Sequence, residues 1–425
     1  MQIENLKIKN FSGFENRTFT FNPRFNLLIG DNASGKTSVL DALAVATGSW
    51  FLGLRGFEKG PGIDPEQVRV AAHKHLDSYT FEKQFVSRIE CSGVVMGKRI
   101  GWARELQREG GRTTSVDARA ISDVANEAEQ LVRGGQEVTL PLICANGTER
   151  LWFFDEGHHR RKKASDDTSR RLSRFDGYRD CFDFTIQETA LVDWIRDEAT
   201  VSLPSKSGTI ALSVVKRAVA ACVEGAKDVY YDGRYRDLVV LIDLSGPQLF
   251  RNLSDGQRIM LTLVGELARR AAILNPHLGD LVLQNTPGVV LVDELDLHLH
   301  PKWQRRVIHD LKATFPSLQF ITTTHSPQLI GEAQPEEIIL LDGGESTMPP
   351  QSFGVDSSRV LEEVMGASSR NQPTEELLSR LFRLIDDENF VGAREALVDV
   401  EAKLGPDDPE VTRARALMTF LESTV

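Results

Sequence analysis

Short runs of branched apolar residues bounded by turn residues predict the strands of this chain, and one run is followed directly by two carboxylates. Val289 to Val292 lie between a Thr-Pro-Gly turn and the acids Asp293 and Glu294. Such a run is typical of a strand buried on both faces in a parallel sheet. Because open α/β sheets bind ligands beyond the carboxyl ends of their strands, both acids should border a ligand crevice. In such a crevice, one carboxylate can hold Mg²⁺ and the next can polarise a water. If only these two residues are considered, a solvated pair of acids at the end of a strand is the alternative.

A second apolar run leads into a glycine-rich loop. Residues 2–9 alternate in polarity, and two or three short strands separated by turn residues are predicted up to Ile29. The segment GDNASGKTS, residues 30–38, follows at once and begins an apolar-periodic helix. This order of strand, loop and helix fits the pattern G-x-x-x-x-G-K-[ST], in which backbone N–H groups and the helix N-terminus surround phosphate oxygens.

This phosphate-loop pattern assigns roles to its side chains. Lys36 should reach the β- and γ-phosphates of a nucleotide, and the Thr37 hydroxyl should ligate Mg²⁺. The implied cofactors are ATP and Mg²⁺, with Thr37 and Asp293 as the metal ligands. The residues expected to bind ATP are Gly30, Asn32, Ala33, Ser34, Gly35, Lys36, Thr37 and Ser38.

The middle of the chain mixes predicted strands and helices. Strands are expected within 81–107, an amphipathic helix within 117–135, and a buried strand within 137–147. Asn146 ends this last strand, where it either senses magnesium and the γ-phosphate or forms an Asn-Gly turn. Apolar residues at i, i+3 and i+4 spacing make residues 176–235 mainly helical, which predicts a helical subdomain inserted in the fold.

A long apolar-periodic helix follows a strand predicted at 237–246, and its start carries Ser254, Asp255, Gly256 and Gln257. A serine at this position is a typical N-cap, and its hydroxyl with free backbone amides at a helix start also forms an anion site. Both interpretations are open for this segment by itself. The order of phosphate loop, helix start and acidic strand favours the anion site.

A histidine follows the next buried strand. Residues 318–322 form its apolar run, and the polar sequence TTTHSP after it contains His325. A lone histidine after a strand is usually structural. At the tip of the strand that follows the acidic one, however, His325 can reach the γ-phosphate and the attacking water.

The last part of the chain predicts an appended helical region. An edge strand and hairpin are expected at 335–345, and two or three amphipathic helices follow beyond about residue 369. A helical tail suggests an interaction surface, while packing onto its own domain is the alternative. The predicted division is 1–75 with the phosphate loop, 76–236 with inserted strands and helices, 237–365 with the remaining motifs, and 366–425 as the tail.

Composition indicates an intracellular protein with ample material for a core. The chain has 425 residues, of which 41% are hydrophobic and 26% charged. It shows no signal-peptide pattern and no apolar run long enough to span a membrane, so a cytoplasmic protein is expected. The four cysteines lack metal-site spacing and are predicted to be buried thiols.

The formal net charge of −11 disfavours general attraction to nucleic acid. Any contact with DNA or RNA must therefore come from a local basic patch or from a partner. Residues 158–174, HHRRKKASDDTSRRLSR, are the densest candidate, with seven Lys or Arg and two His. A solvated insertion loop is the alternative.

Four segments in order, GDNASGKTS, LSDGQR, VVLVDELDLHLHP and TTTHSP, resemble the nucleotide motifs of ABC-type ATPases of the RecF, SMC and OLD group. The resemblance covers roughly residues 1–48 and 237–345. It implies an α/β ABC-ATPase head, a mixed sheet with a P-loop core, which here carries the inserted helical subdomain and the C-terminal tail.

The same resemblance implies the roles of the site residues. Glu294 is the base for the attacking water, and His325 is the switch histidine. Ser254 to Gln257 form a signature that touches the γ-phosphate bound by the other subunit. Asp255 departs from the pattern, because transporter-type proteins have a second glycine there.

The partners follow from a narrower resemblance. LHLHP after the acids, with LPLICANGTERLW and RFDGYRDC in the insert, is similar to the PtuA-type ATPases of bacterial anti-phage systems, Septu and the retrons. This implies an ATPase that acts with a separately encoded HNH nuclease, for which the tail helices offer a docking site. One phosphate loop and one signature per chain also imply a homodimer that encloses two nucleotides, or a larger oligomer.

Other functions fit less well. A nuclease of the OLD type needs a Toprim domain after the ATPase, but the residues past 345 predict helices. Long heptad arms are absent, which argues against an SMC protein, and the LHLHP continuation argues against a transporter motor. The leading hypothesis is an ATP-hydrolysing regulatory subunit of a defence complex, and the alternative is a RecF-like repair ATPase that binds DNA directly.

Overall fold

The structure is a computed structural model that describes residues 1–57, 60–75, 78–147, 173–183, 187–201, 209–342 and 345–424. Contacts within the chain divide it into two units, Met1–Val355 and Asp356–Val425. The finer division into four parts stays a prediction. Residues 158–172 of the basic segment lie outside the described residues, so its contact with nucleic acid also stays a prediction.

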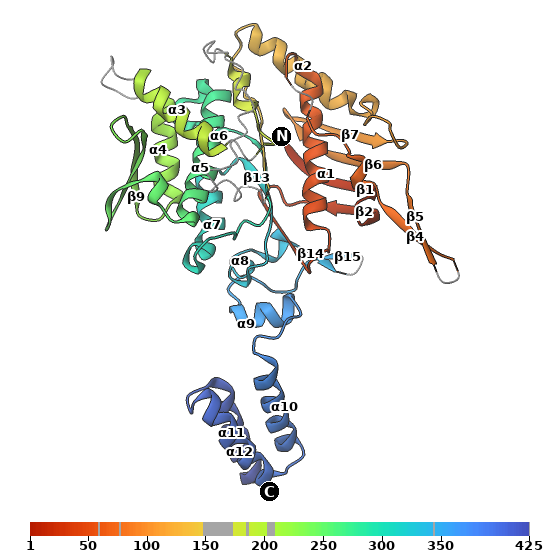
Figure 1. Cartoon of the computed structure of the whole chain (residues 1–425), viewed down its shortest axis with the longest axis vertical. Helices are drawn as coiled ribbons and strands as arrows, with labels where there is room; N and C mark the ends of the chain where they lie inside the picture. Colours follow the sequence, from red (N-terminus) through yellow and green to blue (C-terminus); the bar gives the residue numbers. More distant parts are fainter. Residues whose placement is uncertain are drawn as a thin grey trace. The chain divides into compact units, whose positions relative to one another are not determined.

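Six strands form the central sheet of the first unit, in the order β15-β14-β3-β13-β12-β8 (Figure 1). All neighbouring strands are parallel except β14 and β15. Every residue of β12 and β13 is buried, as expected for strands covered on both faces. The bounds are β3 Phe25–Gly30, β8 Leu142–Asn146, β12 Gly288–Val292, β13 Leu318–Thr323, β14 Ile338–Asp342 and β15 Glu345–Thr347.

The parallel pairing brings the carboxyl ends of β3, β12 and β13 to one edge of this sheet, where the predicted motifs begin. The hairpin predicted at 335–345 is confirmed, because β14 and β15 pair antiparallel. The prediction of an edge strand there was wrong for β14, which lies between β3 and β15. Which strand lies at the edge of a sheet depends on pairing between distant segments, and the local sequence pattern carries no information on that pairing.

A second, antiparallel sheet has the order β2-β1-β6-β7. Its strands are β1 Gln2–Phe11, β2 Phe14–Thr20, β6 Ser87–Val95 and β7 Lys98–Leu106, and a separate ribbon consists of β4 Val70–His75 and β5 Ser78–Lys83. Alternate residues of β6 are buried, which is typical of a sheet with one face on the core. The strands β6 and β7, predicted within 81–107, thus join the N-terminal strands in one sheet, in which β6 pairs with β1 and β7 pairs with β6.

One helix and one glutamine join the two sheets. Helix α1, Lys36–Gly48, contacts strands of both sheets, and the Trp102 indole N–H of β7 donates to the Ala46 carbonyl at 2.9 Å. The buried side chain of Gln319 on β13 donates to the Ile3 carbonyl at 2.8 Å and accepts from the Ile3 N–H at 2.7 Å. The phosphate-loop helix is thus held by both layers.

Helices and a small antiparallel sheet form the remainder of the first unit. Helices α3 Gln187–Val201, α4 Ile210–Cys222 and α5 Asp255–Leu274 pack together, and the sheet has the order β11-β10-β9 (Figure 1). Its strands are β9 Ala226–Asp232, β10 Asp237–Ile242 and β11 Gly246–Leu249. The other helices are α2 Arg119–Arg133, α6 Val282–Asn285, α7 Pro301–Thr314 and α8 Pro327–Ile330.

The prediction that residues 176–235 are mainly helical was wrong beyond Cys222. The chain turns at Gly225, which has a φ of +74°, and continues as β9, whose Val229 is buried between neighbours that are not. Ala226 and Val229 keep a helix-like spacing of three residues, but antiparallel pairing with β10 makes this segment a strand. Short 3-10 helices occur at Ser49–Gly53, Pro65–Gln67, Val116–Ala118, Arg174–Tyr178, Phe250–Asn252, Pro276–Leu281 and Pro335–Glu337.

The second unit consists of helices, as predicted for the tail. A short helix α9, Ser357–Arg359, and a π-helical turn over Val360–Val364 precede α10 Gln372–Asp386, α11 Phe390–Leu404 and α12 Pro409–Thr424. These last three helices enclose a hydrophobic core of their own around Leu381, Ala393 and Ala414. Asn371 and Asn389 cap the starts of α10 and α11.

The prediction that the cysteines are buried thiols is confirmed. All four are buried, and none of them forms a disulfide. Among the described residues, no helix combines the length and the apolar character needed to cross a membrane.

Candidate active site

Glycine is required at two positions of the loop between β3 and α1. Gly30 has a φ of +150° and Gly35 a φ of +96°. A Cβ atom at Gly30 would lie 2.4 Å from the Leu341 carbonyl oxygen, and one at Gly35 would lie 2.5 Å from the Phe14 ring. The two glycines of the sequence pattern are therefore the positions where the backbone leaves no room for a side chain.

Lys36 is buried at the start of α1. Its Nζ donates to the carbonyls of Gly30 at 2.8 Å and Asp31 at 2.9 Å, so the side chain folds back over the loop. Burial lowers the pKa of this ammonium, and the charges of Asp293, Asp31 and Glu294 oppose that shift. The Ser34 hydroxyl is buried with no hydrogen-bond partner among the described residues. A phosphate group in the loop would supply acceptors to both side chains.

Thr37 and Asp293 join the phosphate loop to the acidic strand. The Thr37 hydroxyl donates to Asp293 Oδ2 at 3.0 Å, and the carboxylate is 6% exposed. The Asp293 N–H donates to the Asn146 carbonyl at 2.7 Å, which ties it to the end of β8. A hydroxyl and a carboxylate oxygen in contact are a suitable pair of ligands for Mg²⁺.

Thr323, the last residue of β13, holds both acids in place. Its hydroxyl donates to Asp293 Oδ1 at 2.5 Å and accepts from the Glu294 N–H at 2.7 Å. Glu294 has a φ of +50°, a conformation that is uncommon for residues other than glycine and that occurs at functional sites. Sequence reasoning missed Thr323, which comes directly after Thr322, the residue that pairs with Val292 between β12 and β13.

His325 lies two residues beyond Thr323, in a turn held by hydrogen bonds. The Thr324 hydroxyl donates to Asp296 Oδ1 at 2.5 Å and accepts from the Ser326 N–H at 2.9 Å. The Ser326 hydroxyl donates to Gln304 Oε1 of α7 at 2.8 Å. His325 is partly exposed at the same sheet edge as the acids.

Ser254 caps the start of α5. Its hydroxyl accepts from the Gln257 N–H at 3.4 Å, and its own N–H donates to Gln257 Oε1 at 3.1 Å. Ser254 and Asp255 are exposed, whereas Gly256 is buried against the turn after the acids. A Cβ at Gly256 would lie 2.6 Å from the His298 carbonyl oxygen. The capping role is present in the structure, and the exposed serine is accessible to a second molecule.

Taken together, the residues around the loop fit a nucleoside triphosphate with Mg²⁺. The glycine loop provides a cradle, Lys36 and Ser34 provide donors, and Thr37 with Asp293 provides oxygen ligands. Asp41, one turn along α1 from Thr37, has its pKa raised by burial and by the charge of Asp293. The local field at this edge therefore favours a cation.

Comparison with known proteins agrees with this geometry. Residues 5–197 match a family model described as an AAA domain, and residues 239–331 match a second, described as an AAA domain, putative AbiEii toxin, Type IV TA system. The retron Ec83 probable ATPase of Escherichia coli is 38% identical over 37% of this chain and 29% of that protein. The retron Vc95 probable ATPase of Vibrio cholerae is 25% identical over 89% of this chain and 82% of that protein.

The Septu protein PtuA of Bacillus thuringiensis is 29% identical over 40% of this chain and 46% of its own length. These matches support a resemblance of the chain to ABC-type ATPases of the RecF, SMC and OLD group. The chain spans less than half the length of two of these three relatives. Among solved structures, the SMC head domain from Thermotoga maritima aligns with 83% of this chain and 99% of that chain, at 16% identity and a TM-score of 0.43.

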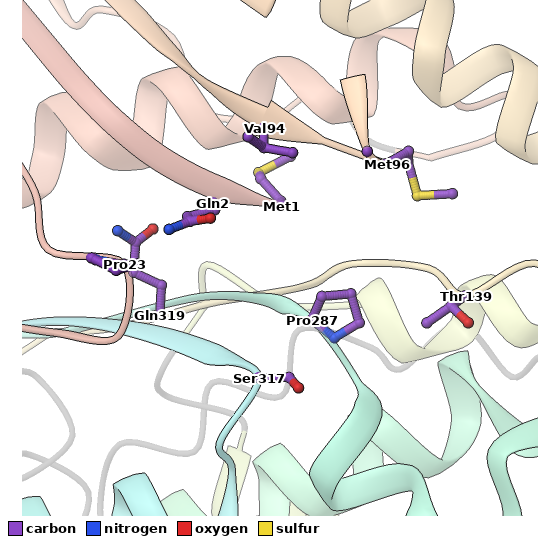
Figure 2. A pocket seen from close by; sticks show the side chains of 10 residues that line it. Met1, Gln2, Pro23, Val94, Met96, Thr139, Pro287, Ser317 and Gln319 are labelled. Carbon is purple, nitrogen blue, oxygen red and sulfur yellow. The ribbon is translucent and has the colours of Figure 1, made fainter. Parts of the chain in front are cut away.

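A cavity of about 380 Å³ lies away from the motifs. It opens among Met1, Met96, Pro287, Ser317 and their neighbours (Figure 2). Pro287 and Ser317 precede β12 and β13, so the cavity lies at the amino ends of these strands. The acids lie at the opposite, carboxyl ends, where parallel sheets bind their ligands.

Replacement of Thr323 by valine should disturb both acids while leaving the loop intact. Valine has a similar shape but leaves Asp293 and the Glu294 N–H without their shared partner, at a cost of about 1–3 kcal/mol. We expect ATP turnover to fall about tenfold or more and ATP binding to persist, as measured by steady-state kinetics and equilibrium binding. Thr322→Val is the matched control, because the Thr322 hydroxyl donates to the Asn26 carbonyl instead. Equal turnover in the two variants would contradict this role of Thr323.

Proposed function

We propose that this ATPase is the nucleotide-binding regulatory subunit of a bacterial anti-phage defence complex. The observation that carries the proposal is the Thr37–Asp293 hydrogen bond, which joins two motifs that are 256 residues apart in the sequence. The names of the relatives, two retron probable ATPases and PtuA of Septu, support the defence role.

Each residue of the site has a proposed role in hydrolysis. Lys36 binds the β- and γ-phosphates, while Thr37 and Asp293 would hold Mg²⁺, which would shield the phosphate charge. Glu294 accepts a proton from the attacking water, and His325 orients this water or contacts the γ-phosphate. General-base catalysis of this kind contributes roughly 10²–10⁴-fold.

We propose that two copies enclose ATP between them. Ser254, Asp255, Gly256 and Gln257 of one copy meet the γ-phosphate bound at Lys36 of the other. The exposed Ser254 hydroxyl at a helix N-terminus supports this arrangement, since such a site attracts anions. An obligate contact of this type buries on the order of 2,000 Å². Because the γ-phosphate favours the closed pair, its hydrolysis opens the pair again.

A nuclease of the HNH type is the proposed partner, and the second unit is its proposed docking site. Helix α11 supports this, because Val391 and Val398 lie seven residues apart on one face and are 75% and 66% exposed. The other face of α11 carries Ala393, Ala396 and Val400 into the core. An apolar surface outside a complete core is typical of a contact site.

A DNA-repair function is the second candidate. The DNA replication and repair protein RecF of Salmonella typhimurium is 35% identical to this chain over 102 residues, which are 22% of this chain and 28% of that protein. Strongly salt-dependent binding of duplex DNA by the purified protein, without a partner, would favour this candidate over the defence role.

Glu294→Gln should trap the closed pair. Without the base, turnover should fall at least about a hundredfold while ATP stays bound, so ATP should shift the protein to a stable dimer in sedimentation analysis. Adding Ser254→Arg should abolish this shift, because the guanidinium and its bulk occupy the contact. Ser245→Arg, at an exposed serine between β10 and β11, is the control and should leave the dimer unchanged. A dimer that persists with Ser254→Arg would refute the arrangement in trans.

Introducing charged residues on the exposed face of α11 should prevent binding of the proposed nuclease partner. In the double variant Val391→Glu and Val398→Glu, co-purification with the proposed HNH nuclease, when the two proteins are co-expressed, should be lost, with ATP turnover unchanged. Leu244→Glu places the same charge at a fully exposed leucine of the first unit and serves as the control. Undiminished co-purification of the double variant would place the docking site elsewhere.

A further inference from the structure

The helix that begins at Ser254 carries a buried ion cluster near its other end. The side chains of Glu266, Arg269 and Arg270 on α5 are 1%, 6% and 1% exposed. Glu266 Oε2 lies 2.7 Å from Arg269 and 3.1 Å from Arg270 Nε. Apolar side chains of similar size often stabilise an interior as well as a buried ion pair does. Stability alone therefore does not account for this cluster, and the contacts of its charged groups with other segments become relevant.

Arg270 holds one short backbone segment. Its guanidinium donates to the carbonyls of Gly177 at 2.9 Å, Arg179 at 2.7 Å and Asp180 at 3.4 Å. Gly177 lies so close to α5 that a Cβ there would be 2.6 Å from Leu274 Cγ. Because the guanidinium is planar and rigid, its hydrogen bonds to three carbonyls fix the position of this segment on α5.

The same segment is bonded to the strand beside the acids. The Cys181 carbonyl accepts from the Ala145 N–H of β8 at 3.0 Å, and the buried Tyr178 hydroxyl donates to the Pro141 carbonyl just before β8 at 2.7 Å. Asn146, the next residue of β8, accepts the Asp293 N–H at 2.7 Å. Hydrogen bonds and short stretches of backbone thus connect α5 with Asp293 through residues 177–181 and the end of β8.

We propose that Arg270 is a positioning residue that couples the helix of the signature segment to the magnesium-binding edge. By fixing residues 177–181 against β8, it sets where Asp293 lies relative to Thr37. A shift of α5 on contact with a second copy is passed to the metal ligand along this path. The inference rests on the proposed roles of Thr37 and Asp293 as magnesium ligands.

Substitution of Arg270 by lysine distinguishes the positioning role from simple neutralisation of the Glu266 charge. Arg270→Lys keeps the positive charge beside Glu266, but a single ammonium cannot reproduce the planar fork that binds three carbonyls. The variant should therefore loosen residues 177–181 while preserving the charge balance of the core. Arg269→Lys is the matched control, since Arg269 contacts the same Glu266 from the preceding position.

The test measures binding of a fluorescent ATP analogue to the full-length protein, with and without Mg²⁺. For Arg270→Lys we expect the Mg²⁺ concentration at half-saturation to rise about tenfold, as is typical when a residue that supports a metal ligand is altered. Affinity for the analogue in the presence of a chelator should stay as in the wild type, and so should the Mg²⁺ dependence of Arg269→Lys. A lowered melting temperature with unchanged Mg²⁺ dependence would show a merely structural role and overturn the proposal.

A milder variant keeps the test decisive if Arg270→Lys does not fold. Tyr178→Phe removes the bond to the Pro141 carbonyl from the same segment and should raise the Mg²⁺ requirement in the same direction. Wild-type Mg²⁺ dependence of folded Tyr178→Phe would then overturn the proposal.

The variants Lys36→Ala and Asp293→Asn separate failure of this proposal from failure of the proposed function. If Lys36→Ala binds the analogue normally, or Asp293→Asn keeps the Mg²⁺ dependence, the assigned site itself is wrong.

Discussion

The contact among Thr37, Asp293 and Thr323 is the constraint on which the active edge depends. Asp293 accepts the Thr37 hydroxyl at one carboxylate oxygen and the Thr323 hydroxyl at the other, at 3.0 and 2.5 Å. Three segments that are far apart in the chain thus meet at one buried carboxylate. Since a buried charge is costly unless it is hydrogen-bonded, the site is stable only while all three segments are in place. Movement of any of them changes the surroundings of the proposed magnesium site.

The sheet order brings these segments together. β3, β13 and β12 are neighbours and run parallel, so the phosphate loop, the histidine turn and the acids leave the sheet at the same edge. Helix α1 then packs between this sheet and the antiparallel one, which fixes the direction in which Lys36 and Thr37 point. The cavity at the amino ends of the strands plays no part in this arrangement.

Sequence alone predicted the parts of the site that are carried by contiguous residues. The phosphate loop could be predicted because Gly30, Gly35, Lys36 and Thr37 lie within eight consecutive residues, and the acids because they directly follow an apolar run. Thr323 and Arg270 could not, since their partners are set by strand pairing and by packing of a distant helix. β9 was mistaken for helix because Tyr230, Tyr231 and Val229 continue an apolar pattern after Gly225. The capping serine was found, but its contact with a second molecule is a property of an assembly and not of one chain.

The central claim is that each ATP is bound by Lys36 of one copy and by Ser254 of another. Mixing two inactive variants, Lys36→Ala and Ser254→Arg, tests it most directly. In a mixed pair, one site combines an intact lysine from one chain with an intact serine from the other, whereas the second site carries both defects. The account predicts that the mixture regains ATP turnover that neither variant shows alone. If the two motifs act within one chain, every site in the mixture stays defective, and an inactive mixture that still forms mixed pairs would contradict the account.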